Sequence, residues 1–311
     1  MLNHIFYRLK YRYAKHLPLN VPVDVSLELS SFCDLRCEFC YHNNQENLPF
    51  EKKFMPTDMA KSIIEQCAEI GVSSIKMNAR GESTLNPNYQ EILNYAGKFN
   101  FIDLLANSNF NFPEKRRNNI LDGMSNLTKV KVSYDSFIKE VFEKQRIRSN
   151  FDLITSNVDA FYNLKNRKTE IVIQAVRTLL NKDEDIEAEA KKKWPNASVS
   201  VRDMVSGRIK KDLSEFENKK RDFTKRQACI QAFARLIFHS NGLVAPCCPS
   251  FKGDLIIGNI NKQSVKEIFN SFAAKQLRDS LKSGEAFKTN KTCIGCSSFE
   301  TFVPYKHPFN S

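Results

Sequence analysis

Three cysteines stand close together in the segment ELSSFCDLRCEFCYHN, residues 28–43. They are Cys33, Cys37 and Cys40, in the spacing C-x3-C-x2-C. A disulfide framework needs an even number of cysteines, and a structural zinc site usually takes four ligands. Three thiolates from one loop are enough to hold three irons of a four-iron cluster. The fourth iron is then open to a small molecule.

A second group of cysteines lies in the last third of the chain. Cys229 and Cys247 bracket two short apolar runs, ARLIF and LVAPC, which are joined through an Asn-Gly turn and predict a hairpin that brings the two thiols together. Cys293 and Cys296 follow as C-x2-C. Four such thiolates fit either zinc or an iron–sulfur cluster. The neighbouring thiol of Cys248 is an alternative ligand to Cys247.

The first two thirds of the chain alternate between strand and helix patterns, as expected of a parallel α/β sheet with right-handed crossovers, open or curled into a partial barrel. Strands are predicted at residues 23–29, 74–78, 101–106, 129–133, 170–176 and 198–202. Helices are predicted from Thr57, as N-cap, to residue 71, and at 88–98, 113–121, 151–164 and 183–193.

Polar groups follow the carboxyl end of every predicted strand. They include the cysteine loop, NARGEST (78–84), ANSN (106–109), SYDS (133–136), Gln174 with Arg177, and Arg202 with Asp203. Because sites of parallel α/β folds lie at these strand ends, we expect the six groups to meet at one mouth.

Composition narrows the class of protein. The chain has 311 residues, 41% of them hydrophobic, and carries nine cysteines. With no secretory signal or transmembrane run in the sequence, the cysteines predict a reducing, cytoplasmic location. The net charge of +12 indicates an anionic partner or substrate. Nucleic acid is not favoured, because only Phe223 is interleaved with the basic clusters at 191–193, 208–211 and 219–226.

The first residues form a basic amphipathic pattern. Leu2, Ile5, Phe6 and Leu9 recur at helical spacing among arginines and lysines. A helix packed on its own barrel is favoured over a helix lying on a membrane, because short patterns of this kind are common.

The motif of the first loop resembles that of the radical S-adenosylmethionine (SAM) superfamily, including an aromatic residue, Phe39, before the last cysteine. The resemblance implies a partial (β/α)6 barrel over residues 23–205. It also implies that Cys33, Cys37 and Cys40 hold a [4Fe-4S] cluster whose open iron binds SAM.

The same resemblance implies residues that bind SAM. Gly81 and Glu82 match the Gly-Gly-Glu segment that meets the SAM amino group, with Arg80 in place of the first glycine. Asn107 and Asn109 resemble the Thr-Asn-Gly segment of relatives.

Three further residues are candidates for SAM binding. Ser133 and Asp135 look like the ribose motif, with a strand-end cap as the alternative. Arg177 is predicted to bind the SAM carboxylate, with a surface salt bridge as the alternative.

A helix is predicted over SVKEIFNSFAAKQLRDSL, residues 264–281. The last third resembles the SPASM auxiliary-cluster domain, or its shortened twitch form, in C-x12-G-x4-C and in the segment GNINKQSVKEIFNS. This implies an N-terminal segment at 1–22, a linker at 206–228 and a SPASM/twitch domain (β-hairpin plus helix) at 229–311. One auxiliary [4Fe-4S] cluster is implied, held by Cys229, Cys247, Cys293 and Cys296.

The resemblance implies a radical SAM oxidoreductase or transformase that cleaves SAM to a 5′-deoxyadenosyl radical and takes hydrogen from its substrate. We expect a sugar, aminocyclitol or other small molecule, oxidised or epimerised, with flavodoxin or ferredoxin as reductant. The alternatives are a peptide-modifying SPASM maturase, which often carries a leader-binding domain, and a non-enzymatic four-cysteine zinc protein that binds nucleic acid. No catalytic acid or base stands out.

Overall fold

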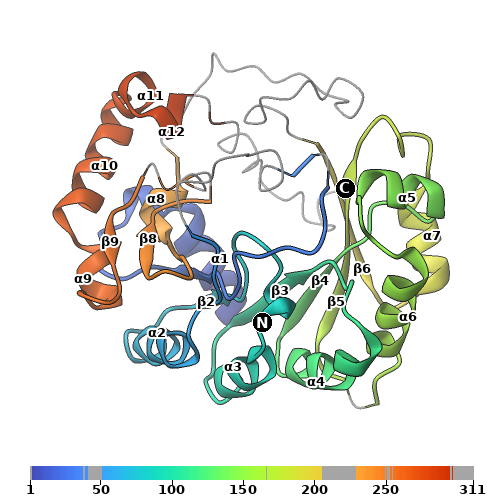
Figure 1. The fold of residues 1–311 in the computed structure, drawn as a ribbon. Coiled ribbons are helices and arrows are strands. Elements are labelled where there is room, and N and C mark those ends of the chain that lie inside the picture. Colours follow the sequence, from blue (N-terminus) through green and yellow to red (C-terminus); the bar gives the residue numbers. More distant parts are fainter. Residues whose placement is uncertain are drawn as a thin grey trace.

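The computed structural model describes residues 2–37, 39–40, 51–165, 167–204, 229–248, 250, 253, 255–294 and 296. Six parallel strands form the centre of the fold, in the order β6-β5-β4-β3-β2-β1 (Figure 1). All six were predicted to within two residues at each end. They are β1 (Asp24–Leu27), β2 (Ser74–Lys76), β3 (Asp103–Ser108), β4 (Lys129–Ser133), β5 (Glu170–Arg177) and β6 (Ser198–Asp203).

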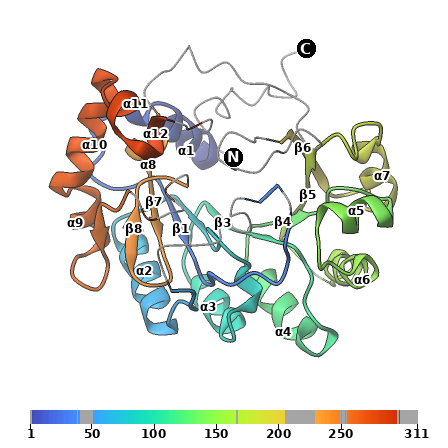
Figure 2. The same cartoon turned by 45° about the horizontal axis from the view of Figure 1, so that its top comes forward.

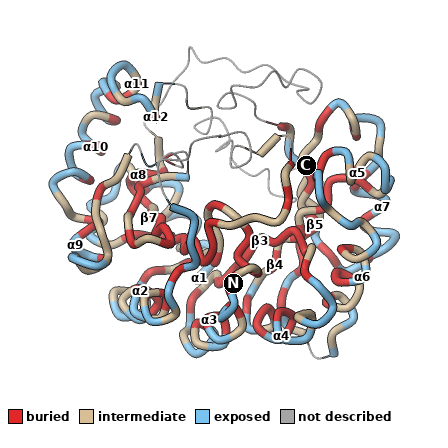
Figure 3. Tube along the Cα trace, in the orientation of Figure 1, coloured by how far each residue is buried: buried red, intermediate tan, exposed pale blue. Residues whose placement is uncertain are grey.

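Helices cover the outer face of this sheet (Figure 1). Alternate strand residues, such as Ile75, Val130 and Ile173, are fully buried there, and the central strands are largely buried (Figure 3). The predicted helices are confirmed as α2 (Thr57–Glu69), α3 (Tyr89–Ala96), α4 (Glu114–Ser125), α6 (Phe151–Tyr162) and α7 (Ile186–Lys193).

Two details of this layer differ from the prediction. Thr57 is the first helical residue of α2, and the N-cap is Pro56, whose extended backbone suits the entry to a helix. The hydroxyl of Thr57 instead accepts a hydrogen bond from Asn88 at 2.8 Å. The short helix α5 (Lys139–Gln145) was not predicted, because it buries only Phe142 and Gln145 and has almost no apolar periodicity.

The C-terminal hairpin extends the same sheet. β7 (Arg235–Phe238) and β8 (Leu243–Ala245) are antiparallel, as predicted, and β8 also pairs with β9 (Gly258–Asn259). β7 lies parallel to β1, so the sheet has nine strands. This pairing satisfies the backbone groups along the outer edge of β1.

The remaining C-terminal elements gather beyond this hairpin (Figure 2). The helix predicted from residue 264 onward is two helices: the first ends at Phe269 with Asn270 as its C-cap, and Ser271 caps the second by accepting from Ala274 N–H at 3.2 Å. The helices are α8 (Gln231–Ala234), α9 (Val265–Phe269), α10 (Phe272–Ser283), α11 (Ala286–Thr289) and α12 (Lys291–Ile294).

Helix α1 (Leu2–Arg12), followed by the 3-10 turn η1 (Ala14–His16), packs on the body of the protein through Tyr7 and Tyr11. The Arg235 guanidinium lies 5.9 Å from the centre of the Tyr11 ring. Packing on its own sheet is the arrangement that the sequence favoured. Leu2 and Phe6 remain exposed on the other side of the helix, at 69% and 65%.

Among the helices within the described ranges, none combines the length and the apolar character needed to cross a bilayer. The predicted linker at 206–228 and the basic clusters at 208–211 and 219–226 lie outside the described residues. The domain boundaries therefore stay predictions.

Candidate functional site

The cysteine loop leaves the carboxyl end of β1 and is tied down by backbone contacts. The Arg36 guanidinium donates to the Cys33 carbonyl oxygen at 2.8 Å, and its backbone N–H donates to the Ile147 carbonyl oxygen at 2.8 Å. Cys40 N–H donates to the Cys37 carbonyl oxygen at 3.1 Å. The three predicted cluster cysteines therefore share one braced loop.

The segment after β2 packs directly against this loop and continues into the 3-10 turn η2 (Ser83–Leu85). Gly81 has φ +64°, and a Cβ there would lie 2.4 Å from the Ser30 carbonyl oxygen and 2.5 Å from that of Phe32. Glu82 N–H donates to the Phe32 carbonyl oxygen at 2.7 Å. Only glycine fits this contact, which explains why the second glycine of the motif is kept.

Replacing Gly81 with alanine should cut the SAM-binding capacity of the folded protein and lower its denaturation midpoint, because the added methyl group meets two backbone oxygens. Gly71→Ala is the matched control: Gly71 has φ +74°, and its Cβ would meet nothing within 4 Å. Urea denaturation and SAM equilibrium dialysis measure the two effects. Equal losses in both variants would show that backbone conformation alone, and not the close approach, matters at Gly81.

Arg80, which stands in place of the first glycine, turns to a buried carboxylate at the end of β1. It forms an ion pair with Glu28 through Nε, and its second nitrogen donates to Glu28 Oε1 at 2.9 Å. Ser240 donates to the same oxygen through its N–H at 3.1 Å and its hydroxyl at 2.9 Å. His239 Nδ1 lies 3.3 Å from Glu28 Oε2. We call Glu28, Arg80, His239 and Ser240 the buried charge network.

This network joins the β2 loop to the C-terminal hairpin. Burial raises the pKa of Glu28, but hydrogen bonds and positive charge from His239 and Arg80 lower it more, so the pKa lies well below the ordinary range. The carboxylate is therefore charged and held by both parts of the chain.

Glu82 is also a buried carboxylate, but its pKa is raised, whereas that of Glu28 is lowered. Its oxygens accept from the N–H and hydroxyl of Thr84 at 3.2 and 2.9 Å and from the N–H of Asn109 at 2.9 Å. In the part of the chain that the structure describes, no basic side chain forms an ion pair with it. Burial, and then the charge of Asp34, raises its pKa to about 7. An ammonium group placed here would offset that cost.

The loop after β3 is also hydrogen-bonded to the cysteine loop. Asn109 and Asn111 each donate from the side-chain amide to one oxygen of Asp34, both at 2.8 Å. Asn107 N–H donates to the Asn78 side chain at 3.2 Å. The amide oxygen of Asn107 is buried without a hydrogen-bond partner among the described residues, so it is available to a ligand.

The residues of the predicted ribose motif differ in their surroundings. Asp135 is fully buried: one oxygen accepts from Val176 N–H at 2.8 Å, and the other lies 2.7 Å from Nε of Arg146. This is the strand-end role that the sequence left open. The half-buried hydroxyl of Ser133 forms no hydrogen bond within the described ranges. Ribose binding by Ser133 and Asp135 stays a prediction.

Arg177 forms hydrogen bonds with the backbone of the loop at residues 181–184. Its guanidinium donates to the carbonyl oxygens of Asn181 and Glu184 at 2.7 and 2.8 Å. It forms no ion pair with the described acidic side chains, so the alternative of a surface salt bridge is not seen there. Binding of the SAM carboxylate by Arg177 stays a prediction.

Arg146 is a site residue that the sequence reasoning missed. Its guanidinium is buried, pairs with Asp135 and lies 5.9 Å from the centre of the Phe39 ring. Burial raises the pKa of Cys37 to about 12, against which the Arg146 charge acts to lower it. Arg146 follows α5, the helix that was not predicted, so no local pattern singled it out.

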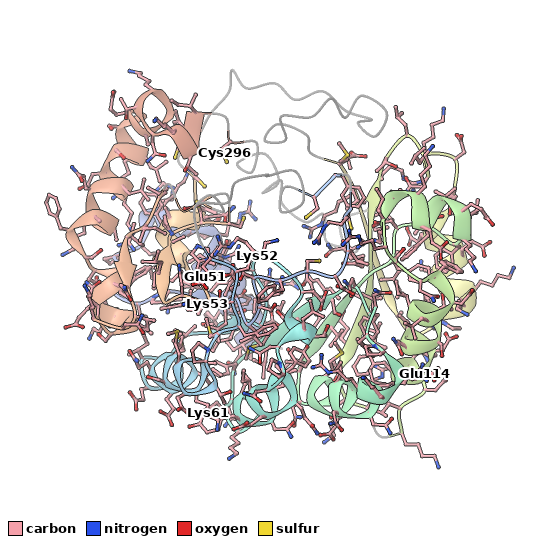
Figure 4. The ribbon with its side chains drawn as sticks, viewed as in Figure 1. Glu51, Lys52, Lys53, Lys61, Glu114 and Cys296 are labelled. Atoms are coloured by element: carbon pink, nitrogen blue, oxygen red, sulfur yellow. The ribbon has the colours of Figure 1, made fainter. Side chains whose placement is uncertain are left out.

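The predicted auxiliary cysteines meet in one pocket. Cys229, Cys247, Cys293 and Cys296 line it together with Leu255, Leu277, Leu281 and Phe287. Figure 4 shows Cys296 just beyond α12, on the side of the C-terminal helices. Burial raises the pKa of Cys229 to about 11. Such thiols bind a metal as thiolates and lose their protons when they do so.

Cys248 does not line this pocket. It is exposed, and its thiol donates to the Gln231 side chain at 3.2 Å. The structure therefore favours Cys247 as the ligand. Across the described ranges, no three Cys, His, Asp or Glu side chains converge closely enough to share a single metal ion. A four-iron cluster does not need such convergence, because each thiolate binds a different iron.

The choice between the two cysteines is testable by substitution. Cys247→Ser should lose most of the iron bound by the C-terminal pocket, whereas Cys248→Ser should keep it, because only the first thiol lines the pocket. Iron and acid-labile sulfide per chain after anaerobic reconstitution measure this. Iron loss in Cys248→Ser alone would make Cys248 the ligand.

Comparison with known proteins agrees with this architecture. Residues 229–297 match the SPASM family, an iron–sulfur cluster-binding domain. No curated protein matches the sequence significantly.

Three solved structures resemble the chain. BtrN in complex with AdoMet and 2-DOIA has 16% identity and a TM-score of 0.57, over 88% of this chain and 92% of that chain. SuiB of Streptococcus suis bound to S-adenosylmethionine has 16% identity and a TM-score of 0.67, over 93% and 74%. Native anSMEcpe with bound AdoMet and Cp18Cys peptide has 15% identity and a TM-score of 0.63, over 84% and 84%.

The comparisons confirm the predicted fold and the predicted auxiliary-cluster domain, and the family match supports an iron–sulfur cluster in that domain. The chain therefore has the fold of the radical SAM enzymes, with a SPASM iron–sulfur cluster-binding domain at residues 229–297.

Proposed function

We propose that the chain is a radical SAM oxidoreductase or transformase that acts on a small molecule. The observation that carries the proposal is the buried carboxylate of Glu82, which forms no ion pair with a described basic side chain. Its charge contributes to the raised pKa of Cys33 in the cysteine loop, after the larger effect of burial. A carboxylate so placed suits the ammonium group of SAM bound at a Cys33, Cys37 and Cys40 cluster.

The residues of the site have separable tasks in this proposal. Cys33, Cys37 and Cys40 hold the cluster as thiolates, and Glu82 accepts hydrogen bonds from the SAM ammonium. When bound, cluster and SAM together supply an electron and a 5′-deoxyadenosyl radical. The Asn107 amide oxygen, which is unpartnered among the described residues, faces no competing protein donor and can orient a bound nucleoside.

The C-terminal pocket holds the auxiliary cluster in this proposal. Its apolar side chains exclude water from the four thiolates, which favours a cluster protected from hydrolysis and oxygen. The match to an iron–sulfur domain favours iron over the zinc alternative. The buried charge network would keep the domain in a fixed position on the barrel. The reductant, flavodoxin or ferredoxin, and the cytoplasmic location belong to the same proposal.

Peptide modification is a second candidate function. SuiB has been determined bound to the precursor peptide SuiA, and anSMEcpe with a Cp18Cys peptide. BtrN instead is in complex with 2-DOIA. We favour the small molecule because basic side chains on the inner face of the sheet, described below, form no ion pair with the residues that the structure describes.

The test is SAM turnover. Anaerobically reconstituted protein, given dithionite and SAM, should form 5′-deoxyadenosine and methionine in equal amounts. Glu82→Gln should bind SAM more weakly, because an amide cannot balance an ammonium charge. Absence of 5′-deoxyadenosine from protein with its full iron content would overturn the proposal.

A further inference from the structure

The inner face of the sheet carries basic side chains from three strands. Strand residues alternate between the two faces, so Lys76 points opposite to the buried Ile75, and Lys131 points opposite to Val130 and Val132, both fully buried. In β6, Val199 packs on the core under the helices, so residues of the other parity face inward. Arg202 is one of these.

Several acidic side chains of the same sheet already have partners. Asp24 pairs with Arg235, Glu28 pairs with Arg80, and Glu170 pairs with Lys129 at 3.1 Å. Asp103 lies 4.0 Å from His4 of α1. Lys76, Lys131 and Arg202 form no ion pair and no hydrogen bond with the residues described here. Within the described residues, three positive charges on one face therefore have no ion-pair partner, although Asp24 acts on Lys76 and Asp103 acts on Lys131 electrostatically.

The three cations repel one another electrostatically. Burial, and then the positive charges of Lys76, Arg202 and Lys129, lowers the pKa of Lys131 to about 8, although Asp103 acts in the opposite direction. Burial and the charge of Arg235 lower the pKa of Lys76, with a further contribution from Arg202. An anion that binds between these cations relieves their mutual repulsion, so its binding is favourable.

We propose that Lys76, Lys131 and Arg202 bind a phosphate or diphosphate group of the substrate on the inner face of the sheet. The proposal rests on the proposed function, whose substrate class it narrows to phosphorylated small molecules. Three cations match a group that carries about two charges better than they match a single carboxylate.

The register places this anion site next to the SAM site. Lys131 pairs with Asn107 of β3, and Ser133 lies two residues further along the same strand, about 7 Å away. Arg202 pairs with Val176, and both Val176 and Phe39 of the cysteine loop pack against Met204. A phosphate held here would leave the rest of a small substrate beside the predicted SAM site.

Binding of inorganic pyrophosphate and inorganic phosphate to reconstituted full-length protein tests the proposal by calorimetry at fixed ionic strength. Lys131→Gln and Arg202→Gln should each weaken pyrophosphate binding about tenfold or more. Pyrophosphate should raise the melting temperature of the wild type and not of these variants. Without pyrophosphate, the variants should melt at or above the wild-type temperature, because removing one cation relieves repulsion.

Two matched controls separate this site from general positive charge. Lys129→Gln removes an inner-face cation of the same strand that is already paired with Glu170, and Lys192→Gln removes an exposed cation of α7. Neither should weaken pyrophosphate binding by more than about twofold. Equal weakening by Lys192→Gln and Lys131→Gln would overturn the proposal.

Competition distinguishes the possible sources of the anion. SAM should not displace pyrophosphate, and acetate should bind far more weakly. Displacement by SAM would assign the cations to the SAM carboxylate, and acetate binding as tight as pyrophosphate would assign them to a carboxylate ligand; either result overturns the proposal. Formation of 5′-deoxyadenosine without substrate, measured on the same samples, should persist in the control variant Lys192→Gln. If the wild type also formed no 5′-deoxyadenosine, the proposed function would be refuted. The pyrophosphate-binding result would still test the anion site.

Discussion

Replacing Cys33, Cys37 and Cys40 together with alanine should halve the iron content and abolish SAM cleavage. If both thiolate sets hold four-iron clusters, reconstituted wild type binds about eight irons and the variant about four. The loop is braced by backbone and Arg36 contacts that the substitutions leave in place, so the fold should survive. Iron, sulfide and zinc per chain, with 5′-deoxyadenosine formation, measure the outcome.

The complementary variant is Cys229→Ala with Cys247→Ala. It should also retain about four irons, and it should keep SAM cleavage, because the predicted SAM-binding loop is intact. Cys67→Ala is the matched control: this thiol is fully buried within α2 and far from any ligand role, so iron content should not change. Zinc in the Cys229 set would contradict the auxiliary-cluster assignment. Eight irons in the Cys33, Cys37 and Cys40 variant would contradict the first one.

Glu28→Gln should destabilise the folded protein by about 3–5 kcal/mol, because it leaves Arg80 buried without its counter-charge. Glu28 is fully buried, so water cannot replace the lost charge. The same change should weaken SAM binding, since Arg80 precedes Gly81 and Glu82 directly. Urea denaturation and SAM equilibrium dialysis give the two quantities.

A double variant identifies the pair as the cause. Glu28→Gln with Arg80→Met should recover about 1–3 kcal/mol relative to the sum of the single losses, because contacting charges are coupled. Glu91→Gln breaks the exposed ion pair with Lys61, at 2.7 Å, and should cost less than about 1 kcal/mol. A loss in Glu28→Gln no larger than in Glu91→Gln would rule out a stabilising role for the network.

The network also fixes a pH dependence of stability. The pKa of Glu28 is lower in the folded chain than its ordinary value of 4.5. Its contribution is therefore fully present above about pH 4.5 and is lost as the pH falls toward the folded pKa. The difference in stability between wild type and Glu28→Gln should shrink on acidification below that point.

Much of the architecture was predictable from local pattern. Strand and helix periodicities recur within short windows, so the six parallel strands and most of their helices were placed correctly. The C-x3-C-x2-C and C-x2-C spacings likewise lie within single loops. Helix α5 and the break before Ser271 escaped prediction, because a short helix and a capping serine have weak periodic signals.

The sequence by itself determined the elements, the thiol sets and the carboxylate of Glu82, because each depends on residues that are neighbours in the chain. Tertiary structure alone decided which distant charges face each other. It paired Glu28 with Arg80 and His239, placed Arg146 beside Phe39, and left Lys76, Lys131 and Arg202 without ion-pair partners among the described residues. The physical reason is that strand order and register, not spacing along the chain, set the distances over which charges act.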